Sequence, residues 1–150
     1  ARTKFAELKA EDNEQNFIRV FDYLKTRKDS NGNIGCVVFC WGGAMSNFLI
    51  ANVPHLKAGV AFYGRQGKIE QIPQIKGALQ LHYAENDERI NAGMATYEDA
   101  LKTNHILYEQ YIYPAVQHAF HNDTSAARYN AEAAQLAWGR TIDFFNKYVK

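Results

Sequence analysis

A short apolar run that ends in a cysteine and two glycines places the strongest constraint on how this chain folds. The run from Ile34 to Phe39 is rich in β-branched residues and apolar on both faces, which is typical of a buried parallel strand. Cys40 follows this run, and Gly42-Gly43 open a helical stretch that continues to about Asn52. A cysteine at such a junction occupies a sharp turn, where its sulfur projects above the sheet edge. The stretch predicts a nucleophile, with a buried core cysteine as the alternative interpretation.

The remainder of the chain alternates between strand-like and helix-like segments. Strands are expected at 57–63, 78–83 and 106–113, because these runs are short and apolar. Three helices are expected from apolar residues at helical spacing: 5–27 with Phe17, Val20, Phe21 and Leu24 on the sheet, 90–101 with Ile90, Met94, Tyr97 and Leu101, and a last helix with Trp138, Ile142, Phe145 and Val149. The polar loop 122–125 is expected to cap the last helix. The alternation predicts the α/β class, with a mainly parallel sheet flanked by helices.

Composition limits the classes of protein that this chain can belong to. The 150 residues are 47% hydrophobic and 22% charged, which fits a single globular domain over 1–150. The formal net charge of +1 gives no field that attracts nucleic acid or an anionic membrane. No apolar run is long enough to span a bilayer. We therefore expect neither nucleic acid nor membrane as a partner, and no cofactor.

The cysteine content favours a reducing compartment. Cys36 and Cys40 lie too close together on one extended strand to close a disulfide, so both are expected to be free thiols. We expect a cytoplasmic protein, or a periplasmic one if a leader precedes this segment. Cys36 is expected to belong to the core.

Two further candidates for catalysis follow strands at their carboxyl ends. Asp87 comes after the strand that ends at Tyr83, and His118 comes after the strand that ends at Tyr113. Open α/β sheets gather their ligand-binding residues at these ends. The chain order of nucleophile, acid and histidine is that of α/β-hydrolases. It argues against the glutamine amidotransferases, whose acid closely follows the histidine.

Neighbouring residues offer alternatives to these roles. Glu85 and Glu88 flank Asp87 and are alternative acids, although Asp87 matches the expected place better. His118, His121 and Asp123 are residue types that can bind a metal ion. Their spacing is not that of a zinc site, so no metal is expected. No partner is evident for three further histidines, His55, His82 and His105. Two aromatic pairs, Phe62-Tyr63 and Phe144-Phe145, fit core packing.

The sequence resembles the dienelactone hydrolases, also called carboxymethylenebutenolidases, over essentially its whole length. The resemblance rests on the blocks Phe39-Cys40-Trp41-Gly42-Gly43, Val60-Ala61-Phe62-Tyr63-Gly64, 82–87 and 113–120. It implies an α/β-hydrolase fold and a Cys40, Asp87, His118 triad that hydrolyses a small ester or lactone through a thioester. It also implies that the backbone N–H of Trp41 supplies half of the oxyanion hole.

The resemblance covers only the carboxyl-terminal portion of the family's fold. About four strands are expected here, where the α/β-hydrolase sheet has about twice as many, so the strand before Cys40 is expected at a sheet edge. A second segment or chain is then expected to complete the sheet, and the upstream glutamate, second oxyanion donor and one substrate arginine of the family lie outside this sequence. Asn122 stands where well-known members carry the other substrate arginine, which weakens dienelactone itself as the expected substrate. The non-enzymatic alternative is an inactive fragment or the structural half of a two-part assembly.

Overall fold

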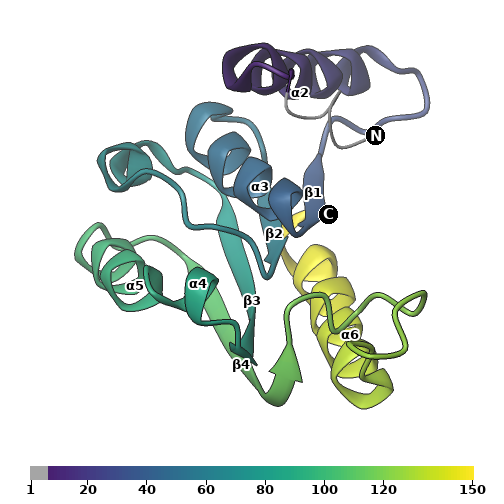
Figure 1. The fold of residues 1–150 in the computed structure, drawn as a ribbon. Coiled ribbons are helices and arrows are strands. Elements are labelled where there is room, and N and C mark those ends of the chain that lie inside the picture. Colours follow the sequence, from purple (N-terminus) through teal and green to yellow (C-terminus); the bar gives the residue numbers. More distant parts are fainter. Residues whose placement is uncertain (1–6) are drawn as a thin grey trace.

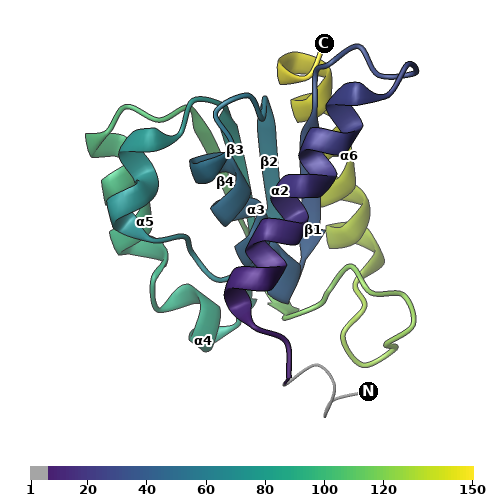
Figure 2. The ribbon, with the colours of Figure 1, turned by 90° about the horizontal axis from the view of Figure 1, so that it is seen from above.

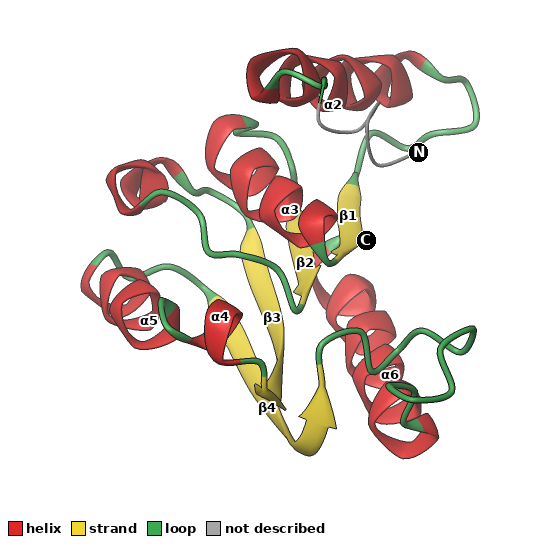
Figure 3. Cartoon of the chain, in the orientation of Figure 1, coloured by secondary structure: helices red, strands yellow, loops and turns green. Residues whose placement is uncertain are grey.

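The protein is built on one parallel sheet, and its computed structural model describes residues 7–150. The sheet has four strands in the order β1-β2-β3-β4, all parallel (Figure 3). These strands are β1 (Gly35–Phe39), β2 (Ala58–Phe62), β3 (Ala78–Asn86) and β4 (Tyr108–Gln117). The predicted α/β class and parallel sheet are confirmed. Within the described residues β1 forms one edge, as expected for the strand before Cys40.

Helices cover both faces of the sheet (Figures 1 and 2). One face carries α2 (Ala10–Thr26), α3 (Trp41–Asn52), the 3-10 helix η1 (Ile69–Gln74), α4 (Glu88–Asn91) and α5 (Met94–Thr103). The opposite face carries α6 (Ala131–Tyr148). The helices between consecutive strands are the crossovers that parallel strands require. None of the helices within 7–150 is long and apolar enough to cross a membrane.

A hydrophobic core lies on each side of the sheet. Leu79 and Leu81 of β3 face the side of α3 and α5, where they pack with Ile50 and Leu101. Residues of β2 fill the other side, among them Phe62, which packs in the same cluster as residues of α6. Successive strand residues point to opposite faces, so β2 is apolar throughout because both of its faces are covered.

The structure corrects the expected environment of the first helix. The helix was expected over 5–27, and the observed helix is α2. Residues 5 and 6 of the expected range lie outside the described part of the chain. Only Phe21 of its apolar stripe is buried, whereas Val20 is 55% exposed. This helix packs against α3, and the rest of its stripe faces β1, the edge strand, without packing closely on it. An apolar groove of about 220 Å³ remains between α2 and β1.

The expected apolar face of the last helix is buried only in part: Phe145 and Val149 pack against the core, whereas the other two residues are exposed. Trp138 and Ile142 are 41% and 43% exposed, while Ala137, Thr141 and Phe144 are buried against the sheet. Small residues let a helix approach the sheet closely, and the apolar pattern alone did not reveal this. The cap is also not in 122–125: the side chain of Asn130 accepts a hydrogen bond from the backbone N–H of Ala133 at 2.9 Å.

The expected helix over 90–101 is divided into α4 and α5. Its buried face is nevertheless the predicted one, because Ile90, Tyr97 and Leu101 are buried. The strand before Cys40 is half-buried along its length, not fully buried, because it lies at the edge.

Candidate active site

Cys40 occupies a strained turn between β1 and α3. Its backbone has φ 55° and ψ −123°, in a region that residues with a side chain seldom adopt. Two hydrogen bonds hold the turn: the N–H of Cys40 donates to the carbonyl of Phe62 at 3.0 Å, and the N–H of Gly43 donates to the carbonyl of Cys40 at 3.0 Å. The turn places the cysteine at the amino end of α3, where the positive end of the helix dipole lies.

Gly43 allows α3 to start directly against the loop that follows β2. A Cβ atom at Gly43 would lie 2.6 Å from the Cα atom of Gly64. This neighbour is backbone, so a side chain at position 43 requires the helix or the loop to move. Glycine at this position therefore lets the turn and the loop after β2 pack closely.

His118 and Asp87 form a hydrogen-bonded pair at the carboxyl ends of β4 and β3. The Nδ1 atom of His118 lies 2.5 Å from Oδ2 of Asp87. Asp87 is 8% exposed, and its Oδ1 accepts a hydrogen bond from the backbone N–H of Ile90 at 3.4 Å. Its carboxylate therefore caps α4 and binds the imidazole at the same time. The bond through Nδ1 leaves Nε2 as the nitrogen for proton exchange.

The two alternative acids have other surroundings. An oxygen of Glu85 accepts a hydrogen bond from the backbone N–H of Ala115 at 2.7 Å. Ala115 has a positive φ of 58°, and the β3–β4 pairing is irregular near this point. Glu85 thus binds the irregular part of β4, and Glu88 is the exposed first residue of α4. Asp87 is the carboxylate that binds His118, which supports its predicted role.

Cys40 lies between two cavities. One, of about 320 Å³, is lined by Cys40, Trp41, Arg65, Arg89 and His118, together with Ala44 and Ile90. The other, of about 290 Å³, is mostly lined by aromatic and loop residues: Phe39, Cys40, Tyr63, Ala119, His121, Asn122 and Asp123. The structure therefore brings the predicted nucleophile and base to one cavity, with Asp87 bound to the base.

Three polar or charged side chains near Cys40 were not identified as site residues from the sequence. Arg65 and Arg89 line the first cavity, and Tyr63, which was assigned to the core alone, is buried and also lines the second. The Tyr63 ring centroid lies 4.9 Å from that of His118. The available signal was position: Arg65 directly follows the end of a strand block, and Arg89 stands two residues after Asp87.

Burial raises the pKa of the Cys40 thiol, and this is the largest influence on it. The charge of Arg128 lowers this pKa, and the charge of Asp87 raises it. The thiol is consequently protonated at neutral pH in the free protein, so its attack on a substrate requires a base. Burial also raises the pKa of Cys36, whose sulfur lies 3.4 Å from Oγ of Ser46.

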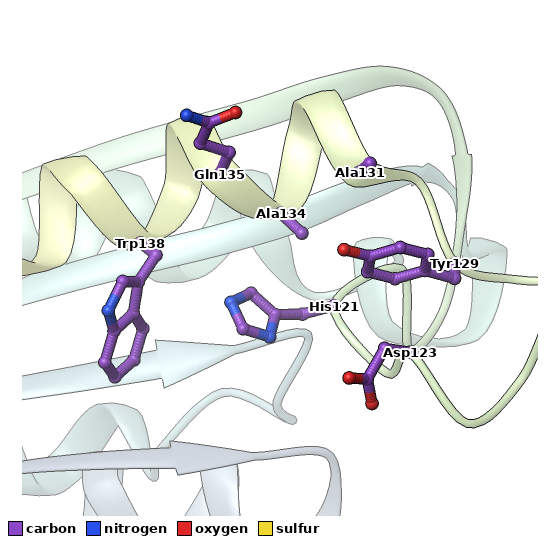
Figure 4. A pocket seen from close by; sticks show the side chains of 7 residues that line it. All are labelled: His121, Asp123, Tyr129, Ala131, Ala134, Gln135 and Trp138. Atoms are coloured by element: carbon purple, nitrogen blue, oxygen red, sulfur yellow. The ribbon is translucent and has the colours of Figure 1, made fainter.

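His121 lines the second cavity beside Cys40 and packs against the Phe39 ring. His121 points between Trp138 and Tyr129 into a third cavity of about 500 Å³ (Figure 4). Within residues 7–150, no group of three or more His, Cys, Asp or Glu side chains is arranged to hold a metal ion.

His82, for which no partner was evident from the sequence, is buried in a polar network. Its Nδ1 lies 2.8 Å from the Tyr113 hydroxyl and its Nε2 lies 2.9 Å from Oε1 of Gln80. Burial lowers the pKa of His82 to about 3, so this imidazole is neutral at physiological pH. We assign it a structural role.

The parallel sheet and the cysteine turn at the end of β1 define a protein of the α/β-hydrolase class. The dienelactone hydrolase family model matches residues 2–149. The chain belongs to the dienelactone hydrolase family.

Individual relatives agree with this assignment. A Saccharolobus solfataricus protein provisionally named carboxymethylenebutenolidase is 34% identical over 134 residues, which cover 89% of this chain and 51% of that protein. The carboxymethylenebutenolidase of Pseudomonas putida is 30% identical over 125 residues, covering 81% of this chain and 52% of that protein. The crystal structure of a Klebsiella pneumoniae protein provisionally named dienelactone hydrolase superposes with a TM-score of 0.82 at 25% identity, over 90% of this chain and 60% of that one. The chain thus spans about half the length of the curated relatives it matches.

Proposed function

We propose that this protein hydrolyses small esters or lactones through a thioester on Cys40. His118 is the general base, Asp87 orients its ring, and the backbone N–H of Trp41 is one oxyanion donor. The observation that carries the proposal is the Nδ1–Oδ2 hydrogen bond between His118 and Asp87, made by a histidine that lines one cavity with the strained Cys40. Family membership supports hydrolysis as the reaction class.

The proposed reaction has two halves. In the first, Nε2 of His118 takes the thiol proton, and the Cys40 sulfur attacks the carbonyl carbon of the substrate. The tetrahedral oxyanion collapses, the C–O bond breaks, and the leaving alkoxide takes the proton from His118. In the second, His118 deprotonates a water molecule, which attacks the thioester carbon. The sulfur leaves and is reprotonated, which releases a carboxylic acid.

The neutral resting thiol gives this mechanism a pH dependence. A free cysteine has a pKa of about 8.5, and burial raises that of Cys40, so its thiolate fraction at neutral pH is lower than in a free cysteine. We expect alkylation of Cys40 by iodoacetamide to be slow at pH 7 and to accelerate as pH rises beyond about 8.5. Peptide mass spectrometry over a pH series measures this rate.

The same experiment tests the proposed function. Cys40 is expected to be alkylated faster than Cys36, and p-nitrophenyl acetate hydrolysis to decline in step with Cys40 alkylation. Equal labelling of the two thiols with unchanged turnover would contradict the proposal. Both cysteines are free thiols, which favours the predicted cytoplasmic location.

A second candidate function is that of one part of a larger assembly. Within the described residues, β1 pairs with β2 alone, and the groove between α2 and β1 is lined by apolar side chains. An uncovered apolar edge is a surface for further pairing. We propose that a further segment or chain completes the sheet of this single domain.

Size-exclusion chromatography of residues 1–150 with an esterase assay tests this candidate. We expect residues 1–150 alone to self-associate and to hydrolyse p-nitrophenyl acetate poorly. An active monomer would contradict a required partner segment.

A further inference from the structure

We propose that Glu85 is a positioning residue, which holds the ring of His118 against Asp87 by binding the backbone of β4. The proposal rests on the proposed function, in which His118 is the base and Asp87 orients it. Glu85 lines neither of the two cavities that the described residues form beside Cys40, so it acts through β4 and not on the substrate.

The pairing of β3 with β4 is interrupted beside Glu85. Between the pairs that Ala84 and Asn86 form, β3 has one residue, Glu85, whereas β4 has three, 114–116. Extra residues bend a strand and change the direction of the side chains near them. Because His118 lies two positions beyond this stretch, the shape of the stretch determines where the imidazole lies.

The backbone of β4 is strained on both sides of His118. Ala115 has a φ of 58° and Ala119 has a φ of 70°, in the left-handed region that residues with a side chain seldom adopt. Pro114 has no backbone N–H to donate to the sheet. Strained conformations persist only where contacts with the surroundings hold them. The segment that carries the proposed base therefore requires a contact from another element.

Glu85 supplies such a contact. Its Oε2 accepts a hydrogen bond from the backbone N–H of Ala115 at 2.7 Å. Its own backbone carbonyl accepts a hydrogen bond from Nδ2 of Asn91, on α4, at 3.1 Å. A hydrogen bond to a carboxylate is stronger than one between neutral groups. Glu85 is thus bound to α4 through its backbone and to β4 through its side chain, which fixes the distance between these two elements.

The links from this contact to the His118–Asp87 pair are short. Asp87 stands two residues after Glu85, and His118 stands three residues after Ala115. Links of this length leave little slack, so a shift of β4 at Ala115 changes the geometry of the bond between Nδ1 of His118 and Oδ2 of Asp87. The ring tautomer changes with it, because the hydrogen bond that a histidine makes decides which nitrogen carries the proton.

Removal of the Glu85 side chain tests the proposal by kinetics. In the protein with its sheet completed, we expect Glu85→Ala to lower kcat for p-nitrophenyl acetate about tenfold and to leave KM within about twofold, because a displaced base slows the reaction. Glu85→Gln keeps an oxygen that accepts the Ala115 N–H, so its kcat is expected to stay within about threefold of wild type. Glu88→Ala removes an exposed carboxylate of α4 and is the control for loss of charge, with no change expected in either value. A glutamine variant as slow as the alanine variant, or an alanine variant as fast as wild type, would overturn the proposal.

The tautomer of the His118 ring separates this inference from the proposed function, because it is measured without turnover. The NMR signals of the two ring nitrogens distinguish a proton on Nδ1 from a proton on Nε2. For the neutral ring we expect the proton on Nδ1 in wild type and Glu85→Gln, and a mixture of the two tautomers in Glu85→Ala. A proton held on Nδ1 alone in Glu85→Ala would overturn the positioning role. If Cys40→Ala leaves ester hydrolysis intact, the proposed function fails, but a tautomer that depends on Glu85 still supports the positioning of His118.

Discussion

In the protein with its sheet completed, replacement of Cys40 by alanine is expected to lower kcat for p-nitrophenyl acetate by about a thousandfold or more. The substitution removes the atom that forms the thioester, and the His118–Asp87 pair then has no side chain to activate. The remaining activity would be that of water held near the base. The initial rate of nitrophenolate release measures the effect.

Cys36→Ala is the matched control for this substitution. Cys36 lies on β1, four positions before Cys40, and its sulfur contacts Ser46 of α3. We expect this variant to keep kcat within about threefold, because a thiol-to-methyl change at a partly buried site is a small perturbation. A large loss with Cys36→Ala and none with Cys40→Ala would exchange the roles of the two thiols.

Replacement of Gly43 by alanine is expected to destabilise the fold by about 3 kcal/mol. The new Cβ would lie 2.6 Å from the Cα of Gly64, and backbone cannot rotate away as a flexible side chain can. Either α3 or the loop after β2 has to move, which also displaces the Cys40 turn. Urea unfolding of the variant and wild type gives the change in the free energy of unfolding.

Gly139→Ala controls for the general effect of replacing a helical glycine. Nothing lies within 4 Å of a Cβ at Gly139, an exposed position of α6. Alanine favours the helix over glycine by about 0.5–1 kcal/mol, so this variant is expected to be more stable than wild type. Stability of Gly43→Ala equal to that of Gly139→Ala would show that the contact at Gly64 does not constrain the turn.

The fold was predictable from the sequence wherever the apolar pattern reports burial directly. The four strands follow the short apolar runs, and Ile90, Tyr97 and Leu101 mark the buried face that the structure shows. The apolar pattern did not predict burial where burial depends on which element packs against the apolar face. Val20 and Trp138 are apolar and at helical spacing, yet both are exposed, because a groove separates Val20 from β1 and the His121 ring covers Trp138 only in part. A pattern shows which face is apolar but not what lies against it.

The proposed triad was predictable from the sequence because a motif and the chain order of its residues indicate it. Cys40, Asp87 and His118 each follow a strand, and parallel strands place such residues at one edge of the sheet. The contributions of Arg65 and Arg89 were not predictable, because membership of a cavity depends on how loops and short helices pack. The bond between Glu85 and the backbone of Ala115 was likewise not predictable, because it depends on the irregular pairing of β4, which has no clear sequence signature.

Mass spectrometry of the acyl-enzyme tests most directly whether Cys40 is the nucleophile. The protein is mixed with p-nitrophenyl acetate, quenched in acid during turnover, digested and analysed by peptide. We predict an acetyl group on the sulfur of Cys40, absent after hydroxylamine treatment and absent in Cys40→Ala. An acetyl group on Cys36 or on another side chain during turnover would contradict a thioester on Cys40. The absence of an acyl-enzyme in wild type, together with undiminished hydrolysis by Cys40→Ala, would contradict it as well.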